Sequence, residues 1–246
     1  MTTSTRVDSR YQDGSYLDAN PTWHEEDAMS KAEWVHGLLG DRSDIRVTSM
    51  CDVGCGTGGV LVGLKKLMGN NIRAVGFEPS AVAVRLANQT HGDVDVIGRA
   101  PTAVDGPFDV ALILDVFEHV DDYYGFLRGL HGLAENYVFH IPLDMTALNV
   151  FRARELMRIR DTLGHIHHFC PQSARDTLAI SGYELVADRF TLVAGELNGD
   201  LPRLVKLLRR LRRSGFRYAP DLTARTIGGL SLLVLARSAD VADEAM

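Results

Sequence analysis

The stretch that most constrains the fold is a glycine-rich segment at residues 51–59, with the sequence CDVGCGTGG. An apolar run, Val47 to Val53, precedes it, and a run with helical spacing, Val60 to Met68, follows it. Glycine at positions 54, 56 and 58 permits left-handed backbone conformations and lets a ligand approach the main chain without meeting a Cβ atom. The segment therefore predicts a strand, a tight turn and a helix, with a ligand bound at the N–H groups of the helix start.

Two classes of ligand use such a turn, and the neighbouring acid separates them. Gly54, Gly56 and Gly59 satisfy the G-x-G-x-x-G fingerprint of dinucleotide sites. Asp52, however, lies two residues before the first glycine, where its carboxylate can face a ligand ammonium. It would repel a pyrophosphate and attract the ammonium and sulfonium of S-adenosylmethionine. The pattern therefore favours S-adenosylmethionine, with a dinucleotide as the alternative.

The string D-V-G-C-G-T-G at residues 52–58 resembles the first motif of class I S-adenosylmethionine-dependent methyltransferases. Glu78 ends a second apolar run ~20 residues after the glycines, where a Rossmann-like fold places an acid on the ribose hydroxyls. Pro79 follows it and suits the first turn of the next helix. The residues that this resemblance assigns to the cofactor in these two segments are Asp52, Gly54, Cys55, Gly56, Gly58, Glu78 and Pro79.

A second resemblance lies at residues 115–122, with the sequence DVFEHVDD, which follows the apolar run Phe108 to Leu114. It is similar to the fourth-strand motif of small-molecule methyltransferases, which often carries a Glu-His pair. The resemblance implies that Leu114, Asp115 and Val116 lie beside the cofactor and that His119 lies at the mouth of the site. The alternative is that the two acids at its end, residues 121 and 122, only cap the next helix.

Three histidines occur within four residues in the segment GHIHHF at 164–169. The segment resembles the G-H-x-x-x-F stretch that follows the fifth strand in many of these methyltransferases and borders the substrate pocket. His165 and His119 are accordingly the first candidates for a general base, with His168 behind them. A structural role and a metal site are the alternatives, but no H-E-x-x-H spacing is present, and we expect no bound metal.

Apolar runs alternate with helical segments along the chain, and the run at 108–114 is typical of a parallel strand buried on both faces. This order predicts an α/β fold with a Rossmann-like, doubly wound, seven-stranded sheet. By resemblance the sheet is mostly parallel, with an antiparallel last strand. We divide the chain into a lid or docking segment at 1–45, a cofactor-binding core at 46–194, a basic helical insertion at 195–228 and the last strand with a tail at 229–246. Within the first segment, Tyr16, Trp23 and His24 are the candidates for a lid over the substrate.

Composition narrows the partners. A net charge of −6 argues against a general nucleic-acid binder. Three cysteines give neither an even disulfide framework nor a C-x-x-C pair. Neither a signal peptide nor a membrane-spanning run is visible in the sequence. We therefore expect a cytoplasmic protein without stable membrane insertion. The run at 201–217 alternates basic residues with leucines and valine, which predicts an amphipathic cationic helix. It is either a solvated helix packed on the domain or a contact for an anionic substrate, a phosphorylated carrier or a membrane surface.

The leading hypothesis is a methyltransferase that uses S-adenosylmethionine to methylate a small molecule, with oxygen as the expected acceptor atom. Oxygen must lose its proton, and histidine suits that task because its ordinary pKa lies near neutrality. Methylation at nitrogen or carbon stays open. The alternatives are an NAD(P)-dependent oxidoreductase and a non-catalytic cofactor-binding scaffold. The scaffold alternative is motivated by the segment 98–101, which lacks the adenine-binding acid of many relatives. Asp105 is the nearest acid to that segment.

Overall fold

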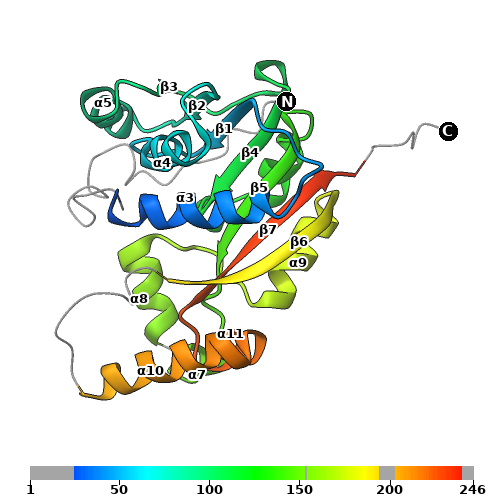
Figure 1. The fold of residues 1–246 in the computed structure, drawn as a ribbon. Coiled ribbons are helices and arrows are strands. Elements are labelled where there is room, and N and C mark those ends of the chain that lie inside the picture. The colour runs from blue at the N-terminus through cyan, green and yellow to red at the C-terminus, as the bar shows by residue number, and fades with distance from the viewer. Residues whose placement is uncertain (1–24, 153, 194–202, 240–246) are drawn as a thin grey trace.

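Seven strands form one sheet in the order β3-β2-β1-β4-β5-β7-β6 (Figure 1). The computed structural model describes residues 25–152, 154–193 and 203–239. Strand β7 runs antiparallel to both β5 and β6, and every other pair is parallel. The strands are β1 (Ser49–Val53), β2 (Arg73–Phe77), β3 (Asp95–Ile97), β4 (Phe108–Leu114), β5 (Ala134–Pro142), β6 (Tyr183–Leu192) and β7 (Leu230–Ser238). The Rossmann-like sheet with an antiparallel last strand is thus confirmed.

Two short helices follow β5, and another helix begins at Pro220, where proline suits the first turn. Asp122 caps α6 by accepting from the N–H of Gly125, at 2.8 Å, as the capping interpretation required of one of the two acids. The helices are α3 (Glu25–Gly40), α4 (Gly59–Met68), α5 (Ala81–Thr90), α6 (Tyr123–Gly129), α7 (Ala147–Phe151), α8 (Arg154–Leu163), α9 (Pro171–Ile180), α10 (Arg203–Tyr218) and α11 (Pro220–Thr226), with short 3-10 turns η1 (Ala103–Asp105) and η2 (Phe117–His119).

Helices cover both faces of the sheet, which explains why its central strands are continuously apolar. On one face, Leu112 of β4 packs in a cluster with Leu38 of α3 and Leu61 of α4. On the other face, Ile113 packs with Leu127 of α6 and Leu178 of α9. Successive residues of β4 therefore enter opposite cores, as the alternation of side chains along a strand requires.

Small residues bring α3 close to α4. A Cβ atom on Gly63 would lie 2.7 Å from the Cβ of Ala32, and one on Gly59 would lie 2.9 Å from the Cβ of Ala28. Glu25, at the start of α3, accepts from the hydroxyl of Thr57 in the glycine turn. The N-terminal helix is therefore docked against the cofactor-binding segment.

We expect Gly63→Leu to lower the free energy of unfolding by roughly 1–3 kcal/mol, because the added side chain must push α3 away from α4. Urea denaturation followed by circular dichroism measures the effect. Gly40→Leu is the matched control. Gly40 is the last residue of α3, and nothing lies within 4 Å of a Cβ atom placed on it. An equal loss in both variants would contradict the close approach.

Candidate active site

A cavity of about 360 Å³ lies where the carboxyl ends of β1, β2, β4 and β5 meet. Ligands of open α/β sheets bind at this edge. Its wall contains every predicted cofactor residue except Gly58, and it contains the histidines at 119 and 165. His168 does not line it, and Tyr16, Trp23 and His24 lie outside the described residues.

The glycine turn has the conformation that its sequence predicts. Gly54, Gly56 and Gly58 have φ values of 74°, 56° and 85°, in the left-handed region that favours glycine. A Cβ atom on Gly54 would lie 3.0 Å from a methyl carbon of Val116, so the turn packs directly on the segment after β4. Gly58 caps α4 instead of lining the cavity. Two separate motifs of the sequence thus form one wall.

Two buried acids lie beside this turn. Asp52 is 3% exposed, and burial raises its pKa to about 7 in spite of the positive charge of Lys31. Glu78 accepts from the N–H groups of Gly56, at 3.0 Å, and Ser80, at 2.7 Å, and burial still raises its pKa above the ordinary value. A ligand ammonium near Asp52 would favour its charged form, and the remaining lone pairs of Glu78 can accept hydroxyl groups. Both residues fit S-adenosylmethionine.

A charged pair that the sequence analysis missed forms another part of the cavity. Lys31 of α3 lies 2.7 Å from Asp115 Oδ2, and His140 Nδ1 lies 2.6 Å from Oδ1 of the same carboxylate. Burial alone would raise the pKa of Asp115, but these two neighbours hold it below its ordinary value. His140 also contacts Thr191 Oγ1, at 2.9 Å, so it is a satisfied buried histidine, as its place in a strand predicts. The sequence carries no signal for Lys31, because its helix reads only as a docking element.

The segment expected beside the adenine has no acid in the wall. Ala100 and Pro101 line the cavity, whereas Asp105 pairs with Arg99, at 2.6 Å, and accepts from the N–H of Thr102, at 2.8 Å. Asp105 therefore does not reach the cavity.

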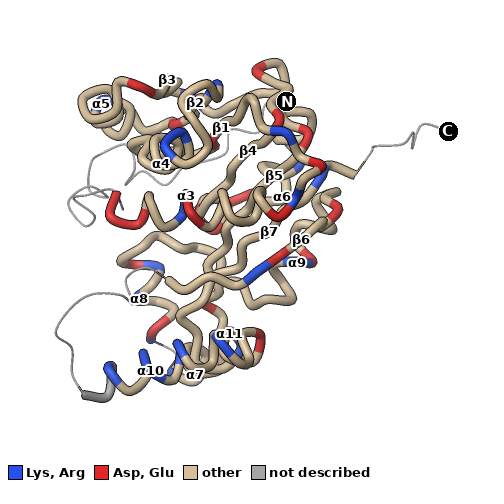
Figure 2. The backbone as a smooth tube through the Cα atoms, in the orientation of Figure 1, with Lys and Arg blue, Asp and Glu red and all other residues tan. Residues whose placement is uncertain are grey.

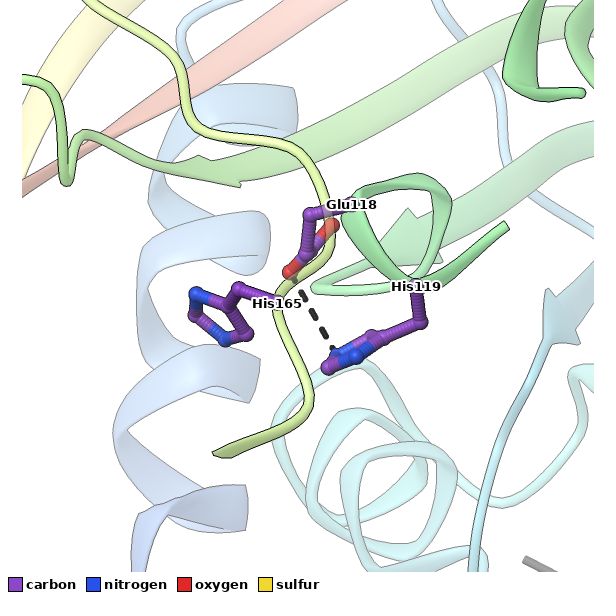
Figure 3. Close-up of side chains that lie close together, drawn as sticks. All are labelled: Glu118, His119 and His165. Carbon is purple, nitrogen blue, oxygen red and sulfur yellow. Dashed lines mark ion pairs between the residues drawn. The ribbon is translucent and has the colours of Figure 1, made fainter. Parts of the chain in front are cut away.

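The Glu-His pair and the histidine-rich segment lie close together (Figure 3), and His119 and His165 both line the cavity. The carbonyl of Glu118 accepts from the N–H groups of Ile166, at 3.0 Å, and His167, at 3.1 Å. His119 Nδ1 lies 3.0 Å from the carbonyl of Gly164. These hydrogen bonds place the rings of His119 and His165 at 75° to each other, with centroids 5.0 Å apart.

Asp144 orients His165. This aspartate follows β5, and its Oδ2 lies 2.5 Å from His165 Nδ1. Burial would raise the pKa of Asp144, but the hydrogen bond from His165 and the nearby His168 hold it at about 2. In the neutral ring, donation from Nδ1–H to the carboxylate leaves Nε2 as the acceptor. His168 Nδ1 lies 3.7 Å from the same oxygen, beyond hydrogen-bond range. Asp144 could have been found as a polar residue at a strand end.

Glu118 is the most unusual group in the site. Its side chain is 0% exposed, and neither carboxylate oxygen has a hydrogen-bond partner. Burial, with the charge of Asp115, raises its pKa well above the ordinary value. Within the described part of the chain, Glu118, His119 and His165 also form the one group whose ligand atoms, all within 4.8 Å of one another, could hold a metal ion. The arrangement can therefore exchange protons or bind a cation.

Comparison with known proteins identifies the family. A family model described as a methyltransferase domain matches residues 23–188. The ubiquinone biosynthesis O-methyltransferase of Pseudomonas aeruginosa (strain UCBPP-PA14) is 29% identical over 127 residues, which are 48% of this chain and 54% of that protein. This chain thus spans about half the length of the curated relative it matches.

Solved structures share the fold at low identity. The plantazolicin methyltransferase BpumL in complex with SAH has a TM-score of 0.62 and 15% identity, over 94% of this chain and 93% of that one. The magnesium protoporphyrin IX methyltransferase of Synechocystis PCC 6803 with bound SAH has a TM-score of 0.56 and 15% identity, over 95% and 97% of the two chains. The family match favours the methyltransferase interpretation over the oxidoreductase alternative. The chain therefore belongs to the methyltransferase domain family, among the class I S-adenosylmethionine-dependent methyltransferases.

Proposed function

We propose that this protein transfers a methyl group from S-adenosylmethionine to an oxygen atom of a small-molecule acceptor, with a histidine as general base. The observation that carries the proposal is one cavity whose wall contains both the glycine turn with its acids and the histidines at 119 and 165. S-adenosylmethionine supplies an electrophilic methyl group on a sulfonium when it is bound. The relative from Pseudomonas aeruginosa, which is named an O-methyltransferase, supports oxygen as the acceptor atom.

The residues of the chain contribute position, dehydration and proton transfer. Asp52 and Glu78, both buried, hold the two parts of the cofactor that carry an ammonium and hydroxyl groups, and so they position the methyl group for transfer. Nε2 of His165 accepts the acceptor's hydroxyl proton, while Asp144 stabilises the resulting imidazolium. His119 is the second candidate, since it lines the same cavity.

We further propose that the segment at 1–45 contributes a lid, with Tyr16, Trp23 and His24 over the acceptor. Support comes from α3, which is the described part of that segment and lines the cavity with Glu25, Asp27 and Lys31. The division into a core at 46–194, an insertion at 195–228 and a last strand at 229–246 stays a proposal of the same kind. The basic helix of the insertion would bind an anionic substrate or carrier.

The experiment that tests the function combines the protein with S-adenosylmethionine carrying a deuterated methyl group and a panel of phenols, sugars, quinols and peptide natural products. We expect at least one acceptor to gain the labelled methyl group at oxygen, as mass spectrometry with fragmentation shows. A label found only at nitrogen or carbon would contradict the oxygen assignment and remove the need for a base.

A divalent cation is a second way for the same cluster to activate an acceptor oxygen, and the carboxylate of Glu118, which has no hydrogen-bond partner, favours it. Glu118, His119 and His165 would be its ligands, and Asp144 would orient the last of them.

Dialysis against EDTA separates the two candidates. With a histidine base we expect turnover to stay within ~2-fold of its value before dialysis, because no step then requires a metal. A loss that Mg²⁺, Mn²⁺ or Zn²⁺ reverses, together with one equivalent of cation retained by the protein but not by Glu118→Gln, would establish the second candidate instead.

A further inference from the structure

Helix α10 exposes two parallel rows of side chains that the proposed reaction does not use. The apolar row contains Leu207, Leu211 and Tyr218, which are 52%, 49% and 77% exposed. The basic row contains Arg210, Arg213 and Arg217, which are also exposed. Members of each row are three, four or seven residues apart, so each row runs along one face of the helix, and the two rows are adjacent.

The opposite side of α10 is docked, which fixes the direction of both rows. Phe216 packs against the hydrophobic core. Arg212 donates to the carbonyl of Ile227 from Nε, at 3.1 Å, and from Nη2, at 2.9 Å. One side of α10 therefore packs on the rest of the protein, and the apolar row on the other side is exposed to solvent.

Further apolar side chains are exposed on the helices next to α10. Phe151 of α7 is 90% exposed, and Leu222 of α11 is 61% exposed. These helices lie with α10 at one end of the molecule, away from α4 and α5 (Figure 1). Lys and Arg recur along α10 (Figure 2), although the whole chain has a net charge of −6. The end of the molecule formed by these helices thus combines positive charge with exposed apolar side chains.

We propose that α10 lies in the surface of an anionic phospholipid bilayer. The apolar row enters the boundary between head groups and acyl chains, and the basic row pairs with lipid phosphates. A nucleic acid would pair with the basic row but leave the apolar row in water, so the bilayer accounts for both rows. Within the described ranges, no helix is long and apolar enough to cross a membrane.

Helix α10 is connected along the chain to two residues of the cavity wall. Val193, which follows β6, and Ser231, in β7, both line the cavity, and α10 lies in the connection between these two strands. The inference concerns binding alone and does not depend on the proposed reaction.

Flotation of the full-length protein with vesicles tests the proposal. We expect binding to vesicles of phosphatidylcholine and phosphatidylglycerol, little binding to phosphatidylcholine alone, and weaker binding at high salt. The double variant Arg210→Glu/Arg213→Glu is expected to bind the anionic vesicles at least ~10-fold more weakly. Leu207→Asn/Leu211→Asn is expected to weaken binding ~10-fold without a change of charge.

A matched control separates the surface from net charge. Lys66→Glu/Arg85→Glu changes the charge equally at exposed positions of α4 and α5, and we expect it to bind like the unaltered protein. Thermal melts confirm that each variant folds. No binding to anionic vesicles, an equal loss in the control, or a leucine variant that binds as before would each overturn the proposal. In the last case, binding of double-stranded DNA that the arginine variant loses would identify a nucleic-acid surface.

Discussion

Asp52→Asn is expected to weaken S-adenosylmethionine binding by at least ~100-fold. In the proposed function the buried carboxylate faces the ligand ammonium, and loss of one partner from a buried charge pair costs ~3–5 kcal/mol. Isothermal titration calorimetry measures the dissociation constant. Asp95→Asn is the control, since Asp95 is exposed in β3 and does not line the cavity. Equal affinities in Asp52→Asn and the unaltered protein would contradict the assignment.

The same substitution should stabilise the ligand-free protein above neutral pH. The pKa of Asp52 is raised from 3.8 to about 7 in the folded state. The neutral acid therefore contributes stability that is fully present below pH ~4 and is lost as pH rises through 7. Asparagine cannot ionise. We therefore expect the difference in unfolding free energy between Asp52→Asn and the unaltered protein to be ~1–3 kcal/mol more in favour of the variant at pH 8 than at pH 4. Urea denaturation at the two pH values measures it, and a larger gain at pH 4 would contradict the burial argument.

His165→Ala is expected to lower kcat ~100-fold at saturating cofactor, because the acceptor hydroxyl loses its general base. The dissociation constant of S-adenosylmethionine should stay within ~2-fold, since a general base acts on the acceptor hydroxyl and not on the cofactor. Single-turnover measurements with a saturating acceptor separate the chemical step from product release.

Two further variants sharpen this prediction. Asp144→Asn retains the shape of the side chain but no longer favours the tautomer that accepts at Nε2, so we expect it also to reduce kcat. His36→Ala, on a half-buried position of α3 outside the cavity wall, should leave kcat unchanged. If neither His165→Ala nor His119→Ala lowers turnover ~100-fold, the histidine-base proposal is wrong.

The cofactor half of the site could be predicted from the sequence because its determinants are local. Gly54, Gly56 and Gly58 require positive φ within a single turn. Asp52 lies one residue before the end of β1 and Glu78 directly follows β2, and the apolar pattern reveals both strands. The parallel order of strands then brings these two strand ends to one edge of the sheet. Backbone conformation and chain order are sufficient for this part.

The acceptor half could be predicted only in pieces. The sequence indicates the Glu-His pair and the histidine-rich segment separately, but the hydrogen bonds from Ile166 and His167 to the carbonyl of Glu118 are tertiary contacts with no pattern of their own. Lys31 reaches Asp115 from a helix more than 80 positions earlier, because α3 packs closely on α4. The position of Asp144 at a strand end can be read from the sequence, but its contact with the ring of His165 required the fold.

The most direct test of the central claim is the thermal stability of the purified protein during titration with S-adenosylmethionine, with NADH in parallel. At a hundredfold excess over its dissociation constant, a specific ligand should add ~2.7 kcal/mol of stability. We predict this gain with S-adenosylmethionine, none with NADH, and its loss in Asp52→Asn. Stabilisation by NADH alone would show that Asp52 and the glycine turn bind a dinucleotide, and it would contradict the proposed methyl transfer.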